Sequence, residues 1–199
     1  MNNKTYHHGD LRNLMIVKGI EFINEHGAKS LSLRKVAAAC GVSHAAPYSH
    51  FANKDELLDA IEKHITHQFA AVLKESVKAV GETPEGLYRM CCAYVLFFAR
   101  NPEHFRFIFI HSDIEVGGDD DEYEPYDFFT DFLKKVFDNV DYPQEMRSKA
   151  FIAQWAMIHG LASLAVMSRA HEDIQHWEEK VQDILSNNYL IPRLETPQC

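Results

Sequence analysis

The stretch "LRKVAAACGVSHAAPYSHF", residues 33–51, places a glycine between two short segments whose apolar side chains recur at helical spacing. This pattern predicts two helices joined by a tight turn, a helix-turn-helix. Val36, Cys40 and Val42 are expected to form the apolar contact between the two helices. Gly41 supplies the left-handed turn that a β-carbon would oppose. Because these positions are constrained together, the pattern is more specific than a single glycine motif.

The second of these helices is expected to present a DNA-reading surface. Ser43 would cap it and leave free backbone amides that can hold a phosphate. Ala45 and Ala46 keep the helix thin enough to approach base edges in the major groove, and Tyr48 and His50 would offer hydrogen-bonding groups. An ordinary solvated helix face is the alternative. The predicted DNA contacts are Ser32, Arg34, Ser43, His44, Ala45, Ala46, Tyr48, His50 and Lys54.

The remainder of the chain also has helical patterns. Ser32, Asn53 and Thr83 stand where side chains can cap helix N-termini, and no run alternates polar and apolar side chains between hairpin turns. We therefore predict an all-α fold in which an N-terminal helix-turn-helix domain, residues 1–52, is joined by a long helix to a helical body, residues 53–199. About nine helices are expected, near residues 10–27, 32–40, 43–50, 53–80, 83–100, 101–113, 126–139, 143–170 and 177–189.

The charge of the chain is unevenly divided. The 199 residues carry a net charge of −9, but residues 1–63 hold 8 basic and 7 acidic residues, a net +1, whereas residues 64–199 hold 12 and 22, a net −10. The near-neutral N-terminal part can approach a phosphate backbone while the acidic part stays away from it. This division is compatible with a double-stranded DNA partner.

Targeting and metal-binding patterns are absent from the sequence. The longest near-apolar run, residues 93–99, is too short to cross a membrane, and the polar start lacks the apolar core of a signal peptide. We therefore expect a cytoplasmic protein with no membrane partner. The four cysteines, Cys40, Cys91, Cys92 and Cys199, have no metal-type spacing, so that no metal and no cofactor are expected.

Aromatic side chains are frequent in the body, and some of them recur four residues apart. Such pairs share one face of a helix, and three helices that each present a pair could enclose an apolar pocket for a small hydrophobic or aromatic effector. The alternative is that these side chains fill a dense core. The six predicted effector-binding residues are Tyr94 with Phe98, Phe128 with Phe132, and Trp155 with His159.

The penultimate long helix carries a row of small residues. Ala153, Ala156, Gly160 and Ser163 follow one another at three- and four-residue spacing, so that another helix can approach closely. We predict that this helix and the last one form a two-fold, four-helix dimer interface.

Residues 9–59 resemble the DNA-binding domain of tetracycline-repressor-like (TetR) regulators. Pro47 departs from the aliphatic residue that is usual before the tyrosine. The arm "YHHGDLR" and the segment "WAMIHG", residues 155–160, resemble a branch of this family named for a Trp-His-Gly motif. The resemblance implies three DNA-binding helices, a variable ligand-binding body and a homodimer. The residues that carry the pattern are Ser32, Ala37, Gly41, Val42, Ser43, Tyr48, His50, Phe51, Lys54 and Leu57.

These observations together predict a transcriptional regulator. We expect a ligand-responsive repressor that reads a palindromic operator as a homodimer and is not an enzyme. Two alternatives stay open. One is a helical enzyme that uses His159 with Cys91 or Cys92, although no base-orienting group or oxyanion nest is visible in the sequence. The other is a DNA-binding protein without a small-molecule effector.

Overall fold

The computed structural model describes residues 8–111, 123–167 and 174–186, and every regular element within these ranges is a helix. The all-α prediction is therefore confirmed, and the eight α-helices found there come close to the nine expected. The α-helices are α1 (His8–His26), α2 (Leu33–Ala39), α3 (Lys54–Val77), α4 (Pro84–Arg100), α5 (Pro102–Arg106), α6 (Glu124–Asn139), α7 (Gln144–Met167) and α8 (Ile174–Ser186). Three shorter helical turns are the 3₁₀ turns η1 (Ala28–Ser30) and η2 (Ala46–Ser49) and the π-helical turn η3 (Phe107–His111).

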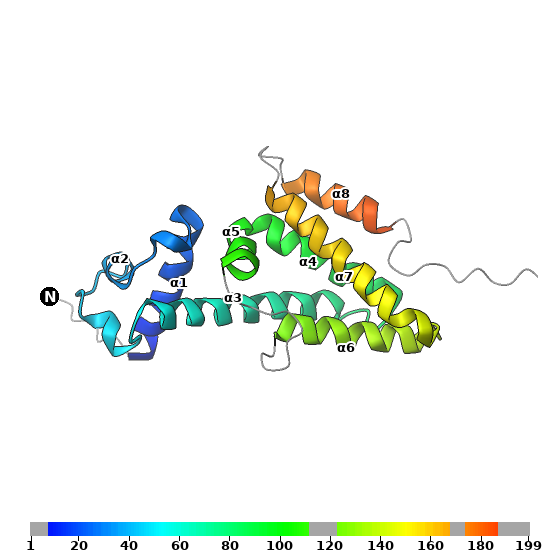
Figure 1. Ribbon diagram of the computed structural model, residues 1–199, viewed down its shortest axis with the longest axis horizontal. Coiled ribbons are helices and arrows are strands. Elements are labelled where there is room, and N and C mark those ends of the chain that lie inside the picture. The colour runs from blue at the N-terminus through cyan, green and yellow to red at the C-terminus, as the bar shows by residue number, and fades with distance from the viewer. Residues whose placement is uncertain (1–7, 112–122, 168–173, 187–199) are drawn as a thin grey trace, which may run out of the picture.

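The long helix α3 connects the two ends of the molecule. Figure 1 shows α1 and α2 at one end of α3 and α4, α6, α7 and α8 toward the other. On α3, Leu57 and Ile61 are buried near its start, and Phe69 and Leu73 are buried further along. A β-carbon built on Gly19 of α1 would lie 2.5 Å from Cδ1 of Ile61, so that α1 and α3 cross closely at this glycine. The division of the chain at residue 52 stays a prediction, since one helix contributes to both ends.

The predicted caps at three helix starts are present. The side chain of Ser32 accepts a hydrogen bond from the amide of Lys35 at 3.3 Å, and that of Asn53 accepts one from Glu56 at 2.9 Å. Thr83 accepts one from the amide of Gly86 at 3.0 Å. These side chains satisfy amides that have no partner within their own helix, which is why the sequence alone located these helix starts.

The second element of the helix-turn-helix differs from the prediction. A helix capped by Ser43 was expected over residues 43–50, but the chain forms a turn and then the 3₁₀ helix η2, with no side-chain cap. Pro47 is the physical reason. It is buried and has no amide hydrogen, so it cannot donate the α-helical bond to the carbonyl of Ser43. Ala46 donates to that carbonyl instead, at 3.0 Å, and the α-helical N-terminus expected at Ser43 does not form.

The helix α7 presents a broad apolar face to solvent. Ile152, Leu164 and Met167 have exposed fractions of 62%, 60% and 70%, whereas Ile158, Ala162 and Val166 on the opposite side are buried. By length and composition alone α7 would be able to cross a membrane; a single helix of this kind is weak evidence, because helices of soluble proteins meet the same criterion.

Candidate DNA-binding surface and effector site

The turn between α2 and η2 has the geometry that the sequence predicted. Gly41 has a φ of +69°, in the left-handed region, and the amide of Val42 donates to the carbonyl of Ala37 at 3.0 Å. Val36 and Ala37 are fully buried, and Cys40 and Val42 are half-buried. The apolar contact across the turn fixes α2 against the segment that follows, so that the side chains after the turn have a defined direction.

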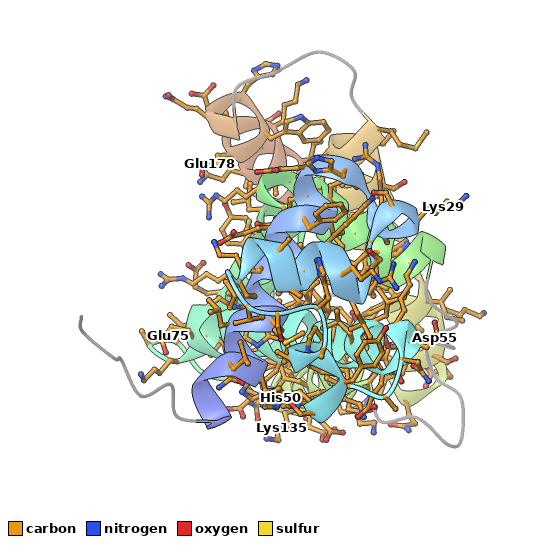
Figure 2. All side chains as sticks on the ribbon, turned by 90° about the vertical axis from the view of Figure 1, so that its left-hand side faces the viewer. Lys29, His50, Asp55, Glu75, Lys135 and Glu178 are labelled. Carbon is orange, nitrogen blue, oxygen red and sulfur yellow. The ribbon has the colours of Figure 1, made fainter. Side chains whose placement is uncertain are left out.

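Most of the nine predicted DNA contacts are accessible. Tyr48 has an exposed fraction of 57%, unusual for a large aromatic side chain, and it lies on η2 after the turn. Figure 2 faces this end of the molecule, with His50 near the lower edge and Lys29 on the opposite side. Arg34, Ser43, His44, Ala45 and Tyr48 are exposed, and Ser32, Ala46, His50 and Lys54 are half-buried.

Lys54 has structural contacts that the sequence did not indicate. Its ammonium group lies 3.4 Å from the carbonyl oxygens of Ala28 and Lys29, which belong to the turn between α1 and α2. Lys35 donates to the carbonyl of Ser30 in the same turn, at 2.7 Å. Both lysines therefore help to hold this turn. If Lys54 also contacts a DNA phosphate, its ammonium group would bind the phosphate and the carbonyls of this turn together.

Phe51 closes the DNA-binding end onto α1. Its ring is buried, and the guanidinium carbon of Arg12 lies 5.1 Å from the ring centroid. This cation–π contact joins α1 to the chain that follows η2. The exposed side chains on η2 therefore stand on a packed base rather than on a free loop.

Four of the six predicted effector-binding residues come together in the body. The hydroxyl of Tyr94 lies 3.0 Å from Nδ1 of His159, and the ring centroids of Tyr94 and Trp155 are 5.6 Å apart. Phe98 packs against Tyr94 at 5.4 Å. The aromatic pairs of α4 and α7 therefore face each other, as the four-residue spacing predicted.

The third predicted pair, Phe128 with Phe132 on α6, does not lie against these four residues, and its part in effector binding stays a prediction. The half-exposed ring of Phe128 lies 5.8 Å from the ammonium of Lys74 on α3, and Phe132 packs beside Gly86 at the start of α4. Phe129 takes their place, with its ring 5.5 Å from Trp155. Consecutive helical residues point about 100° apart, so only one of these neighbours can face α7.

Phe105 on α5 and Phe109 on η3 were not among the predicted effector residues, but they contact the same histidine. The ring centroids of Phe105 and Phe109 lie 5.1 Å and 4.7 Å from that of His159. Tyr123 packs against Phe109 at 6.2 Å, and its buried hydroxyl has no hydrogen-bond partner in the described part of the chain. The same four-residue spacing used for the other pairs would have selected Phe105 with Phe109. We call Tyr94, Phe105, Phe109, Tyr123, Trp155 and His159 the aromatic cluster.

Burial controls the ionisation of this cluster and of the nearby cysteines. It lowers the pKa of His159, so the imidazole is neutral at pH 7, and it raises the pKa of Tyr94 well above its usual value. Burial also raises the pKa of the Cys92 thiol to about 11 and that of Cys91 further. Because a thiolate rather than a thiol is the nucleophile, these cysteines are poorly suited to the enzymatic alternative. No group of three metal-binding side chains occurs within the described ranges.

The small residues of α7 lie on its outward face. Ala153 and Ala156 are exposed, and Gly160 and Ser163 are half-buried. A β-carbon added to Gly160 would meet no atom of the described residues within 4 Å. The row of small residues is therefore not used for packing within the subunit and is available to a partner.

A helix-turn-helix with exposed side chains, carried by one long helix on an all-helical body, defines the class of DNA-binding transcriptional regulators. Sequence models bear this out: that of the bacterial regulatory proteins of the tetR family matches residues 16–61, and that of the tetracyclin repressor-like C-terminal domain matches residues 87–184. The chain belongs to the TetR family of transcriptional regulators. No curated protein sequence matched the chain.

Solved structures of the family have the same fold at low sequence identity. A TetR/AcrR-family regulator from Thermobifida fusca is 19% identical with a TM-score of 0.65, and the match covers 90% of this chain and 98% of that one. A tetR-family protein from Rhodococcus RHA1 is 17% identical with a TM-score of 0.60 over 88% and 94% of the two chains. The fatty acid degradation regulator FadR from Bacillus halodurans is 17% identical with a TM-score of 0.56 over 90% and 96%.

Proposed function

We propose that the protein is a ligand-responsive repressor that acts in the cytoplasm and binds a palindromic operator as a homodimer. The observation that carries this proposal is the placement of two surfaces on α3: the exposed helix-turn-helix at its start and the aromatic cluster beside its later part. Phe69 of α3 packs 5.1 Å from Tyr94 of the cluster, while Ile61 of α3 packs under α1. A change at the cluster can therefore reach the DNA-binding end through one continuous helix.

The proposed DNA contacts divide into two kinds. Arg34 is exposed and has no ion pair or hydrogen bond within the described ranges, which suits a phosphate contact. Tyr48 presents an aromatic ring and a hydroxyl from η2, which suits contact with base edges. Ser43 and His44 lie between them, in the turn. Two copies of this surface, related by a two-fold axis, would read two halves of a palindrome.

The proposed effector response depends on a helix that contacts both regions. The short helix α5 packs against α1 and against α7, and the guanidinium of Arg106 on α5 donates to the carbonyl of Val166 near the end of α7 at 3.0 Å. Phe105 of the same helix contacts His159. An effector that displaces the rings of Phe105 and His159 would move α5 relative to α1. The effector can release DNA only if it binds this displaced arrangement more tightly than the arrangement that binds DNA.

The experiment that tests the proposal measures binding to DNA fragments from the genomic neighbourhood of the gene, by fluorescence anisotropy at several salt concentrations. We call the fragment that the wild type binds most tightly the retained fragment. Arg34→Ala should weaken binding across sequences and lower the salt slope by about one unit, whereas Tyr48→Ala should mainly reduce the preference for the retained fragment. Lys135→Ala, on the body, is the control and should change neither. Equal binding of the retained fragment by wild type and both variants would contradict the proposed surface.

A regulator without an effector is the second candidate, and it is favoured by the dense packing of Phe98. This ring is fully buried among Phe69, Tyr94 and Phe105, as a simple core residue would be. The two candidates differ in the response of DNA affinity to small molecules. A repressor without an effector would keep its operator affinity in the presence of every compound that binds the body.

A further inference from the structure

The hydrogen bond between Tyr94 and His159 determines which nitrogen of the histidine carries the proton. Both groups are neutral at pH 7, because burial raises the pKa of Tyr94 and lowers that of His159. If Nδ1 were the donor, the fully buried hydroxyl of Tyr94 would have no acceptor within the described ranges, which is costly. Tyr94 therefore donates to Nδ1, and the proton of His159 lies on Nε2.

This tautomer leaves a second nitrogen as a hydrogen-bond donor. Nε2 of His159 makes no hydrogen bond within the described ranges, and the ring is only half-buried. Phe105, Phe109 and Trp155 surround the ring, with Trp155 nearly parallel to it at an interplanar angle of 14°. A donor placed among aromatic faces would hold the acceptor of an aromatic molecule.

Tyr123 supplies a second donor next to the same ring of Phe109. Its exposed fraction is 4%, and its hydroxyl is buried with no hydrogen-bond partner among the residues that the structure describes. Burial and the nearby carboxylate of Glu62 raise the pKa of Tyr123, so that the phenol keeps its proton. An unpaired buried hydroxyl costs free energy, and a ligand that accepts a hydrogen bond from it would recover this cost.

The charges near the cluster disfavour an anionic ligand. Within the described ranges the rings contacted by a lysine or arginine are Phe22, Phe51, Phe128, Phe137 and Trp177, none of them in the aromatic cluster. Arg106, the arginine of α5, is bound to Glu103 and to the carbonyl of Val166. A carboxylate among these rings would be desolvated without a cation and would lie near Glu62.

We infer that the aromatic cluster selects uncharged aromatic molecules with a carbonyl oxygen, such as an aryl ketone, because His159 Nε2 and the Tyr123 hydroxyl are two donors without acceptors among the described residues, on rings that contact Phe109. This inference rests on the proposed role of the cluster as the effector site. The proposed function gives only a general preference for aromatic ligands. The inference adds the functional group that the site recognises, a neutral carbonyl.

Four naphthalenes of similar size test the inference with the full-length protein. They are 2-acetylnaphthalene, which has a neutral acceptor; 2-ethylnaphthalene, which has none; 2-naphthoate, an anion; and 2-naphthylmethylammonium, a cation. Titrations followed by tryptophan fluorescence, which includes Trp155, should show the ketone binding about tenfold more tightly than each of the other three, the gain of about one hydrogen bond.

Two conservative variants separate recognition from folding. Tyr123→Phe should remove most of the preference of the ketone over the ethyl compound and leave binding of the ethyl compound unchanged. Tyr126→Phe, which alters another tyrosine that contacts Trp155, is the matched control and should keep the wild-type ratio. A wild-type ratio in Tyr123→Phe would overturn the role of this hydroxyl.

The outcomes distinguish the inference from the function on which it rests. Equal affinity for the ketone and the ethyl compound, or tightest binding of the anion or the cation, would overturn the inference while leaving the cluster as an effector site. Failure of all four compounds to bind would overturn both the inference and the effector site. DNA binding, measured separately on the retained fragment, would be unaffected by either result.

Discussion

His104 on α5 lies in an environment that does not match its chemistry. Its exposed fraction is 6%, and both ring nitrogens are buried with no hydrogen-bond partner among the described residues. Its ring packs 5.9 Å from that of Phe97. Burial, together with His64 on α3, lowers the pKa of His104 below its ordinary value near 6.5. The folded protein therefore holds this histidine neutral, in a site that suits an apolar side chain.

We predict that His104→Leu weakens the acid sensitivity of the fold. Below about pH 6.5 the unfolded chain binds a proton at this histidine that the folded chain does not, so the free energy of unfolding of the wild type falls as the pH falls, and it is unaffected above that range. The variant should be more stable by about 1 kcal/mol at pH 7.5 and by more at pH 5.5. Urea unfolding at both pH values measures this, and equal pH slopes for the two proteins would show that His104 is not the cause.

At the scale of elements, the start of α3 shows how local chemistry positions a long helix. Asn53 accepts a hydrogen bond from the amide of Glu56, and the carboxylate of Glu56 accepts one from the amide of Ala52 at 2.6 Å. This reciprocal pair resembles a capping box and sets the residue at which α3 begins. Because Lys54 on the first turn contacts the carbonyls of η1, the cap also determines how α3 meets the DNA-binding end.

We predict that Asn53→Ala lowers the free energy of unfolding by about 1 kcal/mol, the usual cost of removing such a cap. Asn53→Asp is the matched control: it keeps the acceptor, adds a negative charge at the helix N-terminus, and should be as stable as the wild type. Thermal unfolding followed by circular dichroism measures both variants. A neutral effect of Asn53→Ala would mean that water replaces the side chain at no cost.

At the scale of the whole molecule, the outward face of α7 is an apolar surface that the chain itself does not cover within its described residues. Its small residues form a row, and the large apolar side chains of Ile152, Leu164 and Met167 flank that row in solvent. We propose that this face is the contact between two subunits, since large apolar side chains gathered on one exposed face are typical of an interface. A dimer through this face would also present two DNA-binding ends, as a palindromic operator requires.

We predict that Gly160→Leu separates the subunits without unfolding them. Since a β-carbon added at Gly160 meets no described atom within 4 Å in its own chain, we expect the clash to fall on the partner helix. The dimer dissociation constant should rise at least about tenfold, equivalent to about 1.4 kcal/mol, and operator affinity should fall with it. Sedimentation at micromolar concentration measures the first effect. Gly160→Ala is the control, and a fully dimeric Gly160→Leu protein would place the interface elsewhere.

Local signals in the chain were sufficient for the helices, their caps and the turn of the DNA-binding motif. Ser32, Asn53 and Thr83 each act within three residues along the chain, and Gly41 acts on its own backbone, so that no distant residue is needed to predict them. The family of the protein was also predictable for this reason, because its motif is a run of local constraints. The departure of η2 from an α-helix could also have been predicted from the sequence, since Pro47 lacks the amide hydrogen that an α-helix needs there.

The composition of the aromatic cluster depended on how the helices pack. Spacing correctly paired Tyr94 with Phe98 and Trp155 with His159, but it could not distinguish Phe128 from Phe129 on α6, because the rotation of a helix about its axis is set by its neighbours rather than by its own sequence. The protonation of His159 was likewise invisible in the sequence. It follows from one hydrogen bond to Tyr94, 65 residues away along the chain, and from burial that only the packed body provides.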